Sequence, residues 1–252
     1  MTRTIVAVLA MAFVSVWNGP GRAAEATDTD AILNKAIKAL GGEEKLSKAR
    51  NASWKAKGSV RFGGNENEVT TDSTVQGLDH ARREFEGDFN GNKFKVITVV
   101  AGDKGWRKFG DNQMELDKDA LANEKRAIYL TVIPMTVLPL KGKEFKVAPA
   151  PEEVVDGKPA VGIKATGPDG KDFRIYFDKD SGLPVKVVAR VAGFMGDEYT
   201  QETTFRDYKE MAGIKKATKM QAKRDGEKFQ DFLVTEFKIL DKVDPKTFAE
   251  PQ

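Results

Sequence analysis

The strongest constraint on the fold is an alternation of apolar and polar residues that covers most of the sequence. One face of its first run carries Trp54, Ala56, Val60 and Phe62, and charged or small polar residues fall on the other face. Side chains of a β-strand point alternately to its two faces, so this run predicts a half-buried strand. Turn signals then follow about every ten residues. Asn90-Gly91 is the clearest, because both central positions of a tight hairpin turn take positive φ.

After residue 144 the same pattern returns and continues almost to the C-terminus. Phe173, Ile175 and Phe177 share one face of a predicted strand, and the turn signal Asp180-Ser181-Gly182 follows them. Counting the runs between turn signals gives roughly ten to thirteen strands. Short strands joined by tight turns predict an antiparallel meander in each half of the chain.

Two helical segments precede the first strand. Apolar residues recur at helical spacing over Asp30–Leu40, with Asp28 as a possible cap and Gly41-Gly42 as a terminator. Glu43–Lys48 could add another turn or two. The pattern therefore predicts a short helical region before the sheet begins.

A third helical segment lies between the two meanders. Helix-forming residues run from Asp117 to about Leu130 and continue into a stretch that carries no charge up to Leu140, in a chain that is 31% charged. Pro134 and Pro139 forbid one straight helix, since proline lacks the backbone N–H and its ring clashes with the preceding turn.

A large antiparallel sheet with one apolar face must cover that face. We therefore predict a mainly β protein, built on a single strongly curved antiparallel sheet, a half-barrel with a few helices on its concave side as a plug or lid. A β-sandwich is the alternative. No linker rich in Pro, Gly or Ser divides the sequence, which predicts one domain over residues 27–252.

The first 26 residues have the order of a secretory signal peptide. Arg3 precedes the apolar run Ile5–Val16, and small residues surround Ala24 and Ala26, after either of which cleavage would fit. The alternative is a membrane anchor, but the apolar run is shorter than the roughly 20 residues that a spanning helix needs. The chain has no cysteine, so it cannot be lipidated in the way that a bacterial lipoprotein is. We expect a periplasmic protein without a stable membrane span after cleavage.

The composition argues against several kinds of chemistry. The chain has one histidine, His80, and no cysteine. Thiol catalysis and cysteine-ligated zinc are excluded, and a zinc site built mostly from carboxylates would be uncommon. A carboxylate pair for hydrolysis remains open, but the acidic residues sit mainly in turns or alternate with lysine. The net charge of +3 forms no basic stripe, so nucleic acid is not an expected partner. We expect no enzyme activity, no cofactor and no metal.

Two features favour an apolar ligand. Aromatic residues lie on strand faces, and the charge-free segment contains a methionine, which repacks easily around varied shapes. Ordinary core packing would explain both features equally well. The predicted ligand-binding residues are Trp54, Phe62, Phe94, Ile128, Val132, Met135, Leu138, Phe173, Ile175, Phe177 and Phe205.

Several short motifs resemble the LolA/LolB-like superfamily of periplasmic lipoprotein carriers. The motifs are Phe173-Arg174-Ile175-Tyr176-Phe177-Asp178, Ser181-Gly182-Leu183-Pro184-Val185, Phe205-Arg206-Asp207-Tyr208 before Gly213-Ile214-Lys215, and the ending Leu240–Phe248. Gly102-Asp103-Lys104-Gly105-Trp106 and Ala39-Leu40-Gly41-Gly42 resemble an uncharacterised exported branch of that superfamily.

The resemblance implies a half-barrel whose cavity takes the acyl chains of a lipoprotein or another amphiphile. It also implies a donor or acceptor protein in the envelope, and an arginine that ties the sheet to the lid. Arg82, Arg83 and Arg107 are the candidates for that arginine. An envelope stress sensor or protein-interaction module on the same fold is one alternative, because a shared fold does not determine function. A carboxylate-based envelope hydrolase is the other.

Overall fold

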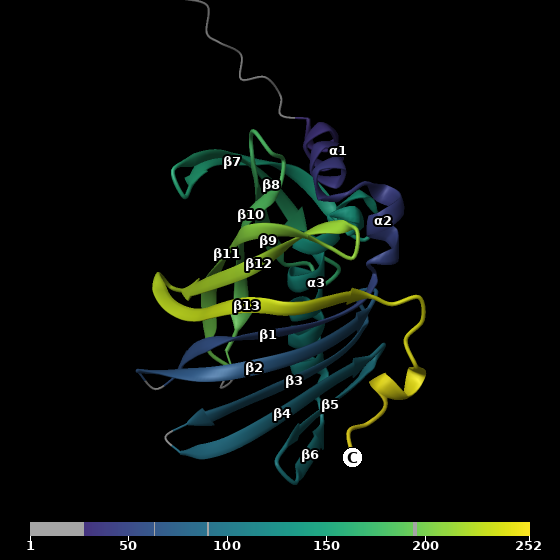
Figure 1. Ribbon diagram of the computed structural model, residues 1–252, viewed down its shortest axis with the longest axis vertical. Coiled ribbons are helices and arrows are strands. Elements are labelled where there is room, and N and C mark those ends of the chain that lie inside the picture. The colour runs from purple at the N-terminus through teal and green to yellow at the C-terminus, as the bar shows by residue number, and fades with distance from the viewer. Residues whose placement is uncertain (1–27, 63, 90, 194–195) are drawn as a thin grey trace, which may run out of the picture.

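A computed structural model of the chain describes residues 28–62, 64–89, 91–193 and 196–252 (Figure 1). The predicted signal peptide, residues 1–26, lies outside the described residues. The described part forms one antiparallel sheet of 13 strands, with three α-helices and two short 3-10 helices. The predicted fold class is therefore confirmed, and the β-sandwich alternative is wrong because all the strands pair into a single sheet.

Two meanders make up the sheet. The first contains β1 (Asn51–Phe62), β2 (Asn65–Gln76), β3 (His80–Phe89), β4 (Asn92–Ala101), β5 (Lys104–Phe109) and β6 (Asn112–Glu115). The second contains β7 (Lys146–Val155), β8 (Lys158–Thr166), β9 (Asp172–Asp178), β10 (Pro184–Ala192), β11 (Glu198–Met211), β12 (Ile214–Arg224) and β13 (Glu227–Ile239). Because β1 pairs with β13, the two meanders join in the middle of the sheet, and β6 and β7 form its two edges.

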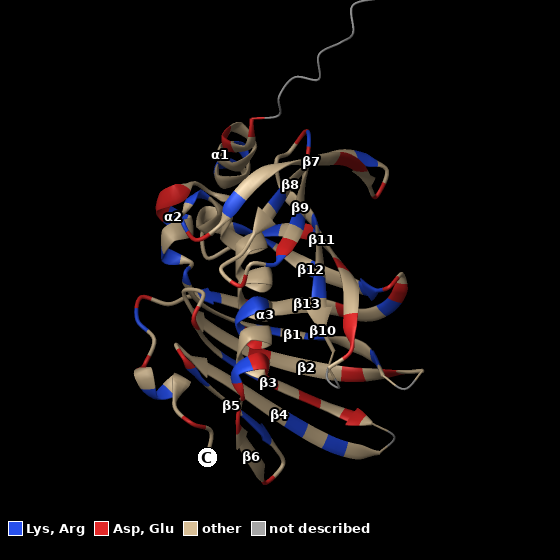
Figure 2. Cartoon of the chain, turned by 180° about the vertical axis from the view of Figure 1, so that it is seen from behind, with Lys and Arg blue, Asp and Glu red and all other residues tan. Residues whose placement is uncertain are grey.

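The connection between these edges has to cross a face of the sheet. It consists of α3 (Lys118–Thr136) and the 3-10 helix η1 (Leu138–Lys141). Figure 2 shows α3 lying across the strands on one side of the curved sheet. The helix therefore covers the concave face, where a plug or lid was predicted.

Strand register in the middle of the sheet places large apolar side chains together. Trp54 of β1 pairs with Phe237 of β13, and both are buried. The two backbones approach closely at Gly58, where an added Cβ would lie 1.9 Å from the carbonyl oxygen of Asp231. Only glycine fits this position. The register shift between Lys55 and Ala56 bends β1 in the same part of the strand.

The two N-terminal helices match the sequence pattern. In α1 (Thr29–Leu40), Leu33, Ala36, Ile37 and Leu40 are buried, and Asp28 accepts a hydrogen bond from the backbone N–H of Asp30. Gly41 ends the helix at a φ of 135°, in the region that glycine enters without strain. The second helix, α2 (Glu43–Lys48), buries Leu46.

The third helix runs further than the sequence predicted. It passes through Pro134 and ends at Thr136, rather than near Leu130. Proline removes one N–H donor but leaves the other backbone hydrogen bonds of the helix intact. Packing of the buried helix face can therefore outweigh the loss of that one hydrogen bond. The break comes at Val137, which has a φ of 62°, and η1 follows it. The prediction that this segment is not one straight helix is confirmed, although its break lies between the prolines.

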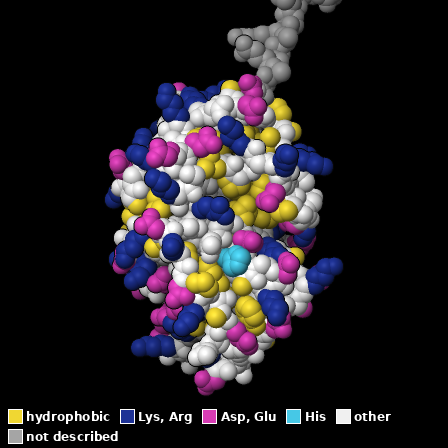
Figure 3. All heavy atoms as spheres, turned by 90° about the vertical axis from the view of Figure 1, so that its right-hand side faces the viewer, with side chains coloured by type: hydrophobic (Ala, Val, Ile, Leu, Met, Phe, Trp, Pro, Cys, Tyr) yellow, Lys and Arg dark blue, Asp and Glu magenta, His cyan; other side chains and the backbone are white. Residues whose placement is uncertain are grey.

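The C-terminal segment contains the 3-10 helix η2 (Pro245–Phe248), whose Phe248 is buried next to His80 at 5.4 Å between ring centroids. On the face shown in Figure 3, basic and acidic side chains are interspersed and form no patch of one sign. That face offers no continuous positive surface of the kind that nucleic acids bind.

Candidate functional site

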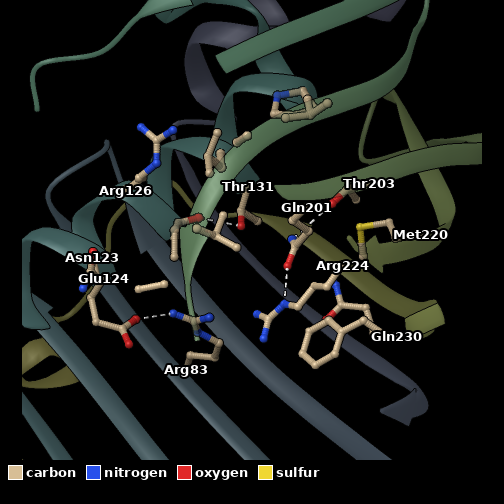
Figure 4. Close-up of a pocket in the computed structure, with 18 of the residues that line it drawn as sticks. Arg83, Asn123, Glu124, Arg126, Thr131, Gln201, Thr203, Met220, Arg224 and Gln230 are labelled. Atoms are coloured by element: carbon tan, nitrogen blue, oxygen red, sulfur yellow. Dashed lines mark hydrogen bonds and ion pairs between the residues drawn. The ribbon is translucent and has the colours of Figure 1, made fainter. Parts of the chain in front are cut away.

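A cavity of about 630 Å³ lies between α3 and the second half of the sheet (Figure 4). Its walls come from α3, from β10 to β13, and from single side chains of β3 and β5. Ligand sites for small molecules typically occupy about 300–1,000 Å³, so this cavity has the size of a binding site. The concave face is therefore only partly filled by the protein's own side chains.

The central part of the cavity wall is apolar. Strand alternation directs one set of side chains from β10 to β13 toward the helix, and the facing turns of α3 complete the wall. The apolar lining residues are Leu130, Pro134, Met135, Val187, Ala189, Val191, Phe205, Ala217, Met220 and Phe229. A hydrocarbon chain would lose its contact with water along these apolar side chains, and charged and polar side chains line the rest of the cavity.

An ion-pair cluster holds one flank of α3 to the first half of the sheet. Glu124 accepts hydrogen bonds from Arg83 of β3 at 2.7 Å and from Arg107 of β5 at 2.6 Å. Figure 4 shows Glu124 and Arg83 at the rim of the cavity. Two of the three arginines that were candidates for tying the sheet to the lid thus contact the helix. The third, Arg82, pairs with Glu84 of its own strand instead.

A second arginine site, absent from those candidates, holds the other flank of α3. Arg126 is 3% exposed and donates from Nε to the carbonyl of Arg190 and from Nη2 to the carbonyl of Asp172, both at 2.9 Å. Its Nη1 lies 2.9 Å from Oδ2 of Asp169 and also contacts the hydroxyl of Tyr129. All three acceptors outside the helix belong to the second half of the sheet or its turns. The helix is therefore fastened on both sides of the cavity.

The partners of Arg126 have shifted pKa values. Burial and the bond to Asp169 raise the pKa of Tyr129, which donates to Oδ2 at 2.6 Å. Burial alone would raise the pKa of Asp169. The hydrogen bonds from Tyr129 and from the Lys171 backbone, with the charge of Arg126, lower it overall. Asp169 is therefore held as a carboxylate.

Three other cations line the cavity without a described carboxylate partner: the exposed Lys215, Arg224 and Lys216. Arg224 donates to Oε1 of Gln201 at 3.0 Å and lies 3.6 Å from the ring centroid of Phe229 (Figure 4). Burial lowers its pKa. Lys216 is 8% exposed, and burial lowers its pKa to about 8. Among the described residues, no hydrogen bond or ion pair reaches its ammonium group.

Of the eleven predicted ligand-binding residues, Met135 and Phe205 border the cavity. Most of the others are buried in the core around it, where they pack against neighbouring side chains. These core residues are Trp54, Ile128, Val132, Phe173, Ile175 and Phe177, and Leu138 is partly buried against the same core.

The remaining two lie away from the cavity, at the far ends of β1 and β4. Phe62 is 58% exposed, because its strand extends beyond the part of the sheet that α3 covers, and its ring lies 5.7 Å from that of Phe89. Phe94 is stacked on Phe89 at 4.4 Å between ring centroids. The sequence predicts which face of its strand each of these rings lies on. Whether a ring is buried depends on whether another element covers that face.

Phe94 also borders a second hollow of about 1450 Å³. This groove is wider and more open, and charged side chains such as Glu66, Lys95 and Asp231 make up much of its lining. An apolar molecule would remain largely in water there. The cavity beneath α3 is the better candidate site because it is more enclosed.

The two buried cations near α3 could have been noticed in the sequence. Arg126 lies three and seven residues before Tyr129 and Ile133, on the buried stripe of its helix. Lys216 lies two residues after Ile214, at an inward position of β12. In each case the sequence signal is a charged residue at a position that the helical or strand periodicity places in the interior.

Within the described residues, no cluster of three or more His, Asp or Glu side chains could hold a metal ion. No helix in that part of the chain combines the length and apolar character needed to cross a membrane.

No protein-family model matches the sequence, and no curated protein matches it either. Several solved structures match the fold. A LolA superfamily protein from Nitrosomonas europaea is 11% identical with a TM-score of 0.58, and the match covers 87% of this chain and 96% of that one. A DUF1329 family protein from Desulfovibrio piger is 15% identical with a TM-score of 0.54, over 87% and 96%.

A third match is a putative outer membrane lipoprotein-sorting protein domain from Vibrio parahaemolyticus, which is 10% identical with a TM-score of 0.51, over 86% and 97%. At these identities the likeness establishes the fold alone. The chain has the LolA-like fold, as its sequence motifs indicated.

Proposed function

We propose that this protein binds an amphiphile with a long acyl chain and carries it through the cell envelope. The observation that supports this most directly is the cavity of about 630 Å³ beneath α3, part of whose wall is apolar. The LolA-like fold of the lipoprotein-sorting domain from Vibrio adds support. The proposal includes export to the periplasm with removal of residues 1–26, and a working domain over residues 27–252.

Entry of a ligand would require α3 to move or loosen. The helix is fastened by Glu124 on one flank and by Arg126 on the other, and both residues line the cavity. Met135 lies in the apolar part of the same helix and can repack as an acyl chain enters. We propose that α3 acts as the lid and that a partner protein in the envelope receives the ligand.

Binding fits the cavity better than hydrolysis does. A glycosidase-type mechanism needs two carboxyl groups free to act on one bond. Glu124 is occupied by two arginines, and Asp117 caps α3 by accepting a hydrogen bond from the backbone N–H of Ala120. Of the three carboxylates that line the cavity, Asp117 and Glu124 therefore have structural partners, which leaves the exposed Asp119 as the one without such a role.

Solvent extraction of the protein purified from its native host, followed by lipid mass spectrometry, tests the proposal. A bound amphiphile should be recovered, and the emptied protein should take up a fluorescent fatty acid. Recovery of no amphiphile together with no uptake would contradict carriage. A stable envelope partner in such a lipid-free preparation would instead favour the interaction-module alternative.

A pair of variants on α3 makes the test specific to this cavity. Ala127 borders the cavity, and Ala122 is exposed on the same helix away from it. Ala127→Phe should fill part of the space and reduce uptake about tenfold or more, whereas Ala122→Phe should bind normally. Equal uptake by both variants would place the ligand elsewhere.

A further inference from the structure

Lys216 is a buried cation for which the described residues provide no counterion. Three charged side chains are buried among the described residues: Arg126, Asp178 and Lys216. Arg126 has the partners described above, and Asp178 accepts hydrogen bonds from the backbone N–H and the hydroxyl of Ser181, both at 2.7 Å. The ammonium of Lys216 has no such partner in the described part of the chain.

The surroundings of Lys216 make this isolation unfavourable. It borders the cavity, and three nearby residues of β12 are buried: Ile214 is 0% exposed, Ala217 4% and Thr218 3%, whereas the adjacent Lys215 is exposed. A buried charge without a partner destabilises a fold, and proteins normally pair or neutralise it. A hydrophobic residue would suit the same position better if the cavity bound only hydrocarbon.

Two cations of β12 that line the cavity have different surroundings. Lys216 and Arg224 both border it and lie eight residues apart on β12, roughly 26 Å at a rise of about 3.3 Å per residue. Arg224 is less buried than Lys216 and already has Gln201 and Phe229 as neighbours. Lys216 is therefore the more buried of the two cations, and it has no described partner. Apolar side chains such as Ala217, Met220 and Phe205 line the cavity together with polar ones such as Gln201 and Thr203.

We propose that the ligand is a single-chain fatty acid whose carboxylate pairs with Lys216, with its hydrocarbon chain extended along β12 beneath α3. The inference rests on the proposed function and specifies its ligand. One negative charge would neutralise one buried ammonium, which fits a carboxylate better than a doubly charged phosphate. The hydrocarbon core of a bilayer is about 30 Å thick for two chains end to end. One chain of about half that length fits between Lys216 and Arg224.

Competition with a fluorescent fatty acid tests the assignment. The competing probes are palmitic acid, its methyl ester and the alcohol of the same chain length, added to the delipidated wild-type protein. We expect the acid to bind about 10- to 100-fold more tightly than the ester or the alcohol, because a charge-assisted hydrogen bond forms only with the acid.

Lys216→Met should remove this preference and leave binding of the ester and alcohol unchanged. Lys209→Met is the matched control, because Lys209 is the exposed register partner of Lys216 on the neighbouring strand and does not border the cavity. It should retain the preference for the acid.

The outcomes separate the two proposals. Equal binding of acid, ester and alcohol by the wild type, or an unchanged preference in Lys216→Met, would overturn the role of Lys216 while amphiphile binding stands. Failure of all three probes to bind the wild-type protein would overturn the proposed function and this inference together.

Discussion

Arg126 of α3 and Asp169, in the turn between β8 and β9, form an ion pair at 2.9 Å in which the guanidinium is almost completely buried. The same guanidinium donates to the carbonyls of Asp172 and Arg190, on β9 and β10. One side chain thus connects the helix over the cavity to three points of the second meander. The position of the helix, and with it the cavity, depends on this contact.

Replacing Arg126 should destabilise the protein strongly. Arg126→Met removes the donor of two buried carbonyls and the partner of Asp169, and breaking a buried charged network typically costs about 3 kcal/mol or more. Chemical denaturation should show this loss. Arg190→Gln is the control, because its side chain makes only an exposed ion pair with Glu198 and its carbonyl remains available to Arg126. Equal stability of the two variants would contradict the structural role of Arg126.

The opposite flank of α3 should loosen when Glu124 is neutralised. Glu124→Gln weakens two charge-assisted hydrogen bonds to strands β3 and β5, with an expected loss of about 1–2 kcal/mol. Amide hydrogen exchange should become faster in the first turns of α3. Lys125→Gln, one residue along, removes only a surface pair with the fully exposed Asp103 and should leave exchange unchanged. Protection in Glu124→Gln equal to wild type would mean that other contacts hold this flank.

Local patterns in the sequence predict most of the sheet and helices. The apolar stripe that includes Leu33 and Ile37 predicts α1. Turn signals such as Asn90-Gly91 separate consecutive strands, and strands joined by so short a turn pair with each other. Burial is harder to predict, because it depends on what lies over a strand. Phe62 shares the inward face of Trp54 but lies beyond the cover of α3. The cavity wall is assembled from residues more than 80 positions apart, such as Met135 and Met220, whose proximity no local pattern encodes.

The carboxylate of Asp169 should stabilise the protein in a pH-dependent way. Its pKa is lower in the folded protein than the usual 3.8, so its contribution is complete above that value and is lost as the pH falls through the folded pKa. Asp169→Asn should reduce stability by about 1–2 kcal/mol at pH 7, and the difference from wild type should disappear in strong acid. Asp180→Asn, in an exposed turn, is the control. A difference that persists unchanged in strong acid would exclude this ionisation as its cause.

Replacing Lys216 should make the ligand-free protein more stable. Its pKa falls from 10.5 to about 8 on folding, so at pH 7 the buried charge opposes folding by about 3 kcal/mol. Lys216→Met removes that charge and should raise the free energy of unfolding by an amount of this order.

The advantage of Lys216→Met should shrink between about pH 8 and pH 10.5. In that range the unfolded lysine binds more protons than the folded one, so the stability of the wild type rises with pH relative to the variant. Chemical denaturation of both proteins at pH 7, 9 and 10.5 measures the trend, and Lys209→Met corrects for the loss of one exposed charge. A destabilised Lys216→Met at pH 7 would mean that the ammonium already has a favourable partner, and it would remove the reason for assigning a ligand carboxylate to that role.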